Sequence, residues 1–123
     1  MKIEFSATEI GCYKEYGVIS CGASNAESSE EYHYINLQRD INPTKDDEGI
    51  YFEIDDQGNC AYNKIEKCNI SKDKLIIEMS KNYEAFPGLK IIVHFNEFNS
   101  EGLEPINIGL KTIFQNFDSK LNA

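Results

Sequence analysis

The sequence predicts an α+β fold, mainly antiparallel β-sheet with one C-terminal amphipathic helix packed on a face. Apolar and polar residues alternate with period two through most of the first hundred residues, which is typical of strands with one buried face. Most connections are of hairpin length, and only antiparallel neighbours can be joined so briefly. After Ser100 the period becomes helical. At 123 residues and 14.0 kDa we expect a single domain over residues 1–123.

The strands follow from the alternation, element by element. In the first, Ile3, Phe5 and Ala7 share one face, and the clearest starts at the turn dipeptide Pro87-Gly88. The polar Ser71–Asp73 predicts a hairpin, Asp56–Asn59 a turn, and Ser80–Phe86 a short helical turn. The predicted strands are Lys2–Ala7, Tyr16–Cys21, Tyr32–Arg39, Ile50–Ile54, Cys60–Tyr62, Ile65–Ile70, Lys74–Met79 and Leu89–Asn96.

A helical wheel at about 100° per residue gives the C-terminal segment one apolar stripe. Pro105 suits the first helical position, where a missing N–H costs nothing, and Glu101 and Glu104 lie where negative charge favours a helix start. Ile108 falls opposite the stripe and could contact a partner. The stripe consists of Ile106, Leu110, Ile113, Phe114, Phe117 and Leu121.

Acidic charge is concentrated in one part of the chain. Residues 27 to 56 hold ten acids against Arg39 and Lys45, a net −8 of the total −9. This excess argues against nucleic acid or an anionic membrane as a partner and favours a basic protein. The alternative is a solvated acidic surface that maintains solubility.

The N-terminal residues contain no apolar run of signal-peptide length, so we expect a cytoplasmic protein. In a reducing compartment the four cysteines should be free structural thiols. They contain no Cys-x-x-Cys pair of the kind that anchors structural zinc. A bridge between Cys12 and Cys21, or a metal site, remains as an alternative.

No pattern in the sequence predicts catalysis, so we expect a binding protein without cofactor or metal rather than an enzyme. His33 and His94 both fall in predicted strands as partly exposed residues, and no nucleophile elbow, phosphate loop or zinc-protease motif is present. The carboxylates at 46–48 and 53–56 lack the ligand spacing of a calcium loop, and a hairpin turn explains residues 55–59 equally well.

Aromatic residues interspersed among acids are the candidate partner contacts. Tyr51 alternates with Glu53 and Asp55 on the outward face of its predicted strand, and Tyr32 and Tyr34 share a face in the same acidic region. The alternative is that these tyrosines pack in the hydrophobic core, with their hydroxyls at the edge of the core. The candidate partner-binding residues are Tyr32, Tyr34, Asp46, Asp47, Glu48, Tyr51, Glu53, Asp55, Asp56 and Gln57.

A set of positions between residues 32 and 117 forms a characteristic pattern. It consists of Gln38-Arg39, the run Tyr51-Phe52-Glu53-Ile54-Asp55-Asp56-Gln57, then Tyr62, Ile65, Leu75, Phe95, Leu110 and Ile113-Phe114. This pattern resembles the immunity protein 10 family of bacterial polymorphic toxin systems. Pro105 and Gly109 depart from the continuous helix expected of that family. The resemblance implies a small cytoplasmic protein that binds and neutralises a cognate toxin domain.

Two functions therefore stand as expectations. The first is toxin neutralisation, through the acidic stretch with its tyrosines or through an exposed sheet edge. The second is a small-ligand or calcium-binding β-sheet domain that uses the carboxylates after Ile54.

Overall fold

The computed structural model describes residues 1–123 and contains two five-stranded sheets and one α-helix, so the predicted α+β class is confirmed. Neighbouring strands are antiparallel, except that β1 pairs with β9 and β10 with β7 in parallel. Sheet A has the order β1 (Lys2–Ser6), β9 (Lys90–His94), β8 (Lys74–Met79), β7 (Ile65–Ile70), β10 (Leu121–Asn122). Sheet B has the order β2 (Glu9–Glu15), β3 (Val18–Ser24), β4 (Tyr34–Asp40), β5 (Tyr51–Ile54), β6 (Asp56–Tyr62).

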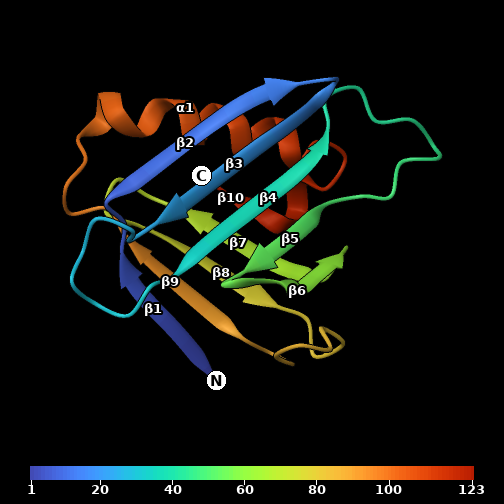
Figure 1. Cartoon of the computed structure of the whole chain (residues 1–123). Coiled ribbons are helices and arrows are strands. Elements are labelled where there is room, and N and C mark those ends of the chain that lie inside the picture. The colour runs from blue at the N-terminus through green and yellow to red at the C-terminus, as the bar shows by residue number, and fades with distance from the viewer.

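The hydrophobic core lies between the sheets and helix α1 (Ser100–Ile113), which packs against β2, β3 and β4 (Figure 1). Both sheets contribute alternate side chains of their strands to one buried cluster of 26 residues. The rings of Phe52 from β5 and Tyr83, which follows β8, meet edge to face with centroids 5.9 Å apart. The prediction specified one sheet, and the structure divides its strands between two.

Local alternation located some strands correctly. β7 and β8 have the predicted bounds, and β9 lies inside the predicted range. β2 and β10 were missed, β3 extends three residues beyond its predicted end, and Ser80–Phe86 forms turns rather than a helix. The predicted turn at 56–59 is also wrong, because the chain reverses at Asp55 (φ 63°) and β6 begins at Asp56. Aspartate tolerates this left-handed conformation better than most residues.

Helix α1 begins five residues before the predicted start. Asn99 caps it, and its side-chain oxygen accepts a 2.8 Å hydrogen bond from the Gly102 N–H. Pro105 therefore lies inside the helix. The predicted stripe is buried from Ile106 to Phe114, but the helix ends at Ile113. The Ile113 carbonyl accepts a hydrogen bond from Arg39 in place of a further helical N–H. Phe117 and Leu121 instead precede and follow a 3-10 turn, η1 (Asp118–Lys120).

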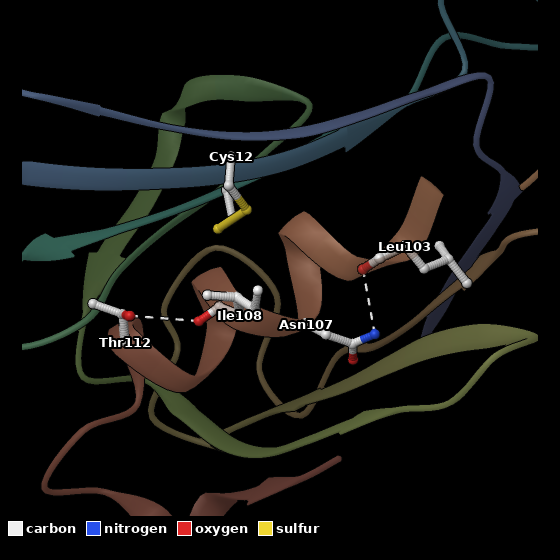
Figure 2. The surroundings of a disulfide bond; sticks show 6 residues. Cys12, Leu103, Asn107, Ile108 and Thr112 are labelled. Atoms are coloured by element: carbon white, nitrogen blue, oxygen red, sulfur yellow. Dashed lines mark hydrogen bonds between the residues drawn. A yellow bond between two sulfur atoms is a disulfide. The ribbon is translucent and has the colours of Figure 1, made fainter. Parts of the chain in front are cut away.

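Cys12 and Cys21 form a disulfide, so the expectation of free thiols is wrong for this pair. The two are register partners on β2 and β3, with Cα atoms 4.1 Å apart. Because β2 was not predicted from the sequence, no predicted strand pairing placed these two cysteines opposite each other. The bridge lies over helix α1 (Figure 2), where a Cβ on Gly109 would stand 2.3 Å from Cys21 Sγ. Cys60 is an exposed thiol, and burial raises the pKa of the Cys68 thiol to about 12.

Arg39 connects sheet B, helix α1 and the acidic loop. Its guanidinium donates to the Ile113 carbonyl at 2.9 Å and to the Gln115 carbonyl, and it pairs with Asp47 at 3.1 Å. A cation near a helix C-terminus interacts favourably with its dipole. The side chains of Arg39 and Asp47 are only 3% and 9% exposed, so this ion pair is structural.

The 14-residue α1 is neither long nor apolar enough to span a membrane.

Candidate partner-binding face

The side of sheet B that faces away from helix α1 is here called the outer face. Cys12 and Cys21 point toward α1, so strand alternation and register place their neighbours on the opposite side. The same parity extends across β4, β5 and β6. The outer face comprises Glu9, Gly11, Tyr13, Glu15, Val18, Ser20, Gly22, Ser24, Tyr34, Asn36, Gln38, Asp40, Tyr51, Glu53, Cys60 and Tyr62.

This face carries four carboxylates and no lysine, arginine or histidine. The acids are Glu9, Glu15, Asp40 and Glu53, and four tyrosines lie among them. The outer face of sheet A is mixed in sign by contrast. There Lys2 pairs with Glu4 at 3.3 Å, and Glu78 is the register partner of Lys90. The outer face of sheet B is therefore acidic, and of its four acids only Asp40 and Glu53 come from the acidic stretch at residues 27–56.

Glu53 is the one buried acid of the outer face. Only 9% of the residue is exposed, and both carboxylate oxygens accept hydrogen bonds, one from the Tyr34 hydroxyl and one from the Tyr51 hydroxyl. Burial, and then the hydrogen bond to Glu53, raises the pKa of Tyr34 and of Tyr51 above the usual tyrosine range. Both hydroxyls donate to Glu53, and these two hydrogen bonds fix the positions of the Tyr34 and Tyr51 rings.

The remaining tyrosines extend this ordered patch on both sides. Tyr62 meets Tyr51 edge to face with ring centroids 5.4 Å apart, and burial followed by a hydrogen bond to Glu48 raises the pKa of Tyr62. Tyr32, just before β4, lies 5.8 Å from the Tyr34 ring by centroid distance. Tyr32 and Tyr62 remain 55% and 47% exposed, so their rings are available for contact.

The structure brings together only part of the predicted set. Tyr34, Tyr51 and Glu53 lie on the outer face, Tyr32 and Glu48 lie at its margins, and Asp46 and Gln57 are exposed nearby. Glu53 shares the outward face with Tyr51, as the alternation predicts, but it is buried there because the Tyr34 and Tyr51 hydroxyls donate hydrogen bonds to its carboxylate.

Three predicted acids have structural partners instead. Asp47 pairs with Arg39. Asp55 accepts hydrogen bonds from the Tyr34 N–H at 3.1 Å and from His33 Nδ1 at 2.8 Å. It lies beyond the end of β5, so it does not share the outward face of that strand with Tyr51. Asp56 accepts a 2.7 Å bond from the Gly58 N–H. Of these, Asp55 and Asp56 are the carboxylates that the calcium alternative would use, and each accepts at least one hydrogen bond from the protein itself.

The sequence prediction missed the part of the face that β2 contributes. Glu9, Gly11, Tyr13 and Glu15 all face outward there, next to the outward residues of β3. A period-two signal is present in this segment, since Ile10 and Cys12 alternate with more polar residues, but glycine and cysteine weaken it. Tyr13 is 61% exposed, which makes it the most exposed aromatic ring of the outer face.

Comparison with known proteins adds no relative to this description. No protein-family model matches the chain, and no curated protein matches it. The resemblance to immunity protein 10 sequences therefore rests on the residue pattern between residues 32 and 117 alone.

Proposed function

We propose that this chain is an immunity protein that binds a cognate toxin domain and neutralises it by binding, without chemistry of its own. The observation that carries the proposal is the outer face of sheet B, where ordered tyrosines stand among four acids with no basic side chain. Buried tyrosines at an interface centre supply large contact area at low entropic cost, and unpaired acids favour a basic partner.

The ordering of Tyr34 and Tyr51 by Glu53 supports binding rather than mere solubility. A solubilising surface needs charge, but it needs no fixed aromatic rings. Here the two hydroxyls are already hydrogen-bonded before any partner arrives, so little side-chain entropy is lost on association. The surface is thus preorganised for a contact.

Co-expression with the C-terminal domain encoded by the neighbouring gene tests the proposal. We expect this protein to rescue growth of a sensitive host and to copurify with that domain. Failure of both, with each protein soluble, would overturn the pairing. A calcium-dependent rise in melting temperature would instead support the ligand-binding alternative.

A matched pair of triple variants tests the face itself. Glu9→Gln, Glu15→Gln and Asp40→Asn remove three charges from the outer face, and the control removes three from exposed acids elsewhere, Glu66, Glu84 and Glu97, each replaced by glutamine. The net charge changes equally. At low salt we expect the first variant to slow association about tenfold and the control to have a much smaller effect. Equal slowing by both would refute a local role for this face.

A further inference from the structure

The outer face contains a hollow with glycine at its floor and tyrosine at its walls. Gly11 on β2 and Gly22 on β3 are register partners, so two adjacent strands lack a side chain at the same place. The resulting cavity has a volume of about 490 Å³. We call this cavity the glycine hollow. The lining residues that matter for its chemistry are Glu9, Gly11, Tyr13, Gly22, Tyr32 and Tyr34.

The two glycines have different reasons to be there. A Cβ on Gly22 would stand 2.9 Å from the Ile35 carbonyl oxygen, so internal packing requires glycine at that position. A Cβ on Gly11 would meet nothing within 4 Å, and its backbone is not left-handed. Glycine in a strand interior is destabilising and often marks a place where another molecule approaches closely. Folding therefore gives no reason for the missing side chain at Gly11.

The chemistry of the walls identifies the occupant. Tyr13 and Tyr32 present largely exposed rings, Tyr34 is held in place by Glu53, and the acid of the hollow is Glu9. No basic side chain lines the cavity. Aromatic faces beside a carboxylate attract a planar cation, and a guanidinium can stack on tyrosine while it binds a carboxylate through two N–H groups. We infer that the glycine hollow receives an arginine side chain of the partner protein.

This inference rests on the proposed function for the identity of the partner, but the hollow can be probed without it. The probe is N-acetyl-L-arginine amide, titrated into the ¹⁵N-labelled full chain and followed by amide chemical shifts. Its comparator is the citrulline derivative, which has the same shape without the charge. We expect saturable shifts at Gly11, Gly22 and their neighbours with arginine only. Equal shifts with citrulline, or no shifts in the hollow, would overturn the inference.

Gly11→Leu fills the hollow and should abolish the arginine shifts. Because the new Cβ meets open space, we expect an unchanged or higher melting temperature. The matched control is Ser6→Leu, which adds a leucine at an exposed position on the outer face of sheet A and should leave the shifts intact. Retained arginine shifts in a folded Gly11→Leu protein would refute the site.

The same two variants separate this inference from the proposed function. With a toxin domain that copurifies, we expect Gly11→Leu to weaken binding at least about tenfold and Ser6→Leu less than about twofold. Toxin binding that Gly11→Leu leaves unchanged would refute the arginine site while the immunity function stands. Arginine shifts in the hollow without any toxin binding would refute the immunity function alone.

Discussion

Gly109→Ala tests how helix α1 is seated on the disulfide. A Cβ at this position would stand 2.3 Å from Cys21 Sγ, 2.5 Å from Cys12 Sγ and 3.2 Å from Cys12 Cβ. The optimal separation of non-bonded carbon atoms is about 3.5–4.0 Å, and sulfur is larger than carbon. The helix or the disulfide must therefore move by more than about 1 Å to accept a single methyl group.

The expected magnitude follows from two opposing terms. Overpacking a well-packed core costs about 1–3 kcal/mol, and a displacement of this size belongs near the upper end. Alanine in place of glycine within a helix contributes about 1 kcal/mol in the other direction. We therefore expect Gly109→Ala to lower the free energy of unfolding by about 1–2 kcal/mol.

Urea unfolding followed by circular dichroism measures this change, provided that the slope with denaturant stays constant. The control is Gly102→Ala in the first turn of the same helix. Its Cβ would lie 3.4 Å from Asn99 Oδ1, an ordinary contact, so we expect stability to stay the same or to rise slightly. Equal effects of the two alanines would show that the helix does not rest on the sulfurs.

A double-mutant cycle makes the test specific to the disulfide. With Cys12 and Cys21 both replaced by alanine, the two closest sulfur contacts of the new methyl group disappear. Gly109→Ala should then cost at least about 1 kcal/mol less than it does in the disulfide-bonded protein. The same cost in both backgrounds would refute the proposed clash.

Three further substitutions test the ion pair, the tyrosine cluster and the helix cap. Arg39→Ala leaves a buried carboxylate unpaired, so we expect a loss of about 3–5 kcal/mol in urea unfolding, with a smaller loss for Arg39→Lys; a loss below about 1 kcal/mol would contradict this. Tyr34 and Tyr51 have raised pKa values, so the unfolded state binds fewer protons than the native state above about pH 10 and stability should fall as pH rises there, less steeply in Glu53→Gln. A flat profile in pH-dependent unfolding would refute this. Asn99→Ala should cost about 1 kcal/mol in thermal or urea unfolding and Asn99→Asp much less, whereas equal costs would exclude a capping role.

The candidate site was predictable only where local alternation shows which side of a strand a residue occupies. Tyr34 and Tyr51 could be placed on one face from the sequence, and the acidic excess around them could be counted. Tyr51 and Glu53 are two positions apart on β5, so their contact is local. Tyr34 lies 19 positions from Glu53, and only the β4–β5 register brings its hydroxyl to the same carboxylate. The hollow over Gly11 depends in turn on pairing with Gly22.

By itself, the sequence determined the fold class, the bounds of β7 and β8 and the apolar stripe of α1, because each depends on periodicity within a few residues. Tertiary structure alone decided that the strands form two sheets, that Cys12 bonds to Cys21 and that Asp47 is neutralised by Arg39 while Glu9 is left without a cation. These outcomes depend on pairing between segments far apart in the chain. Strand register, helix seating and burial are decided together by packing, and no local pattern of residues encodes them.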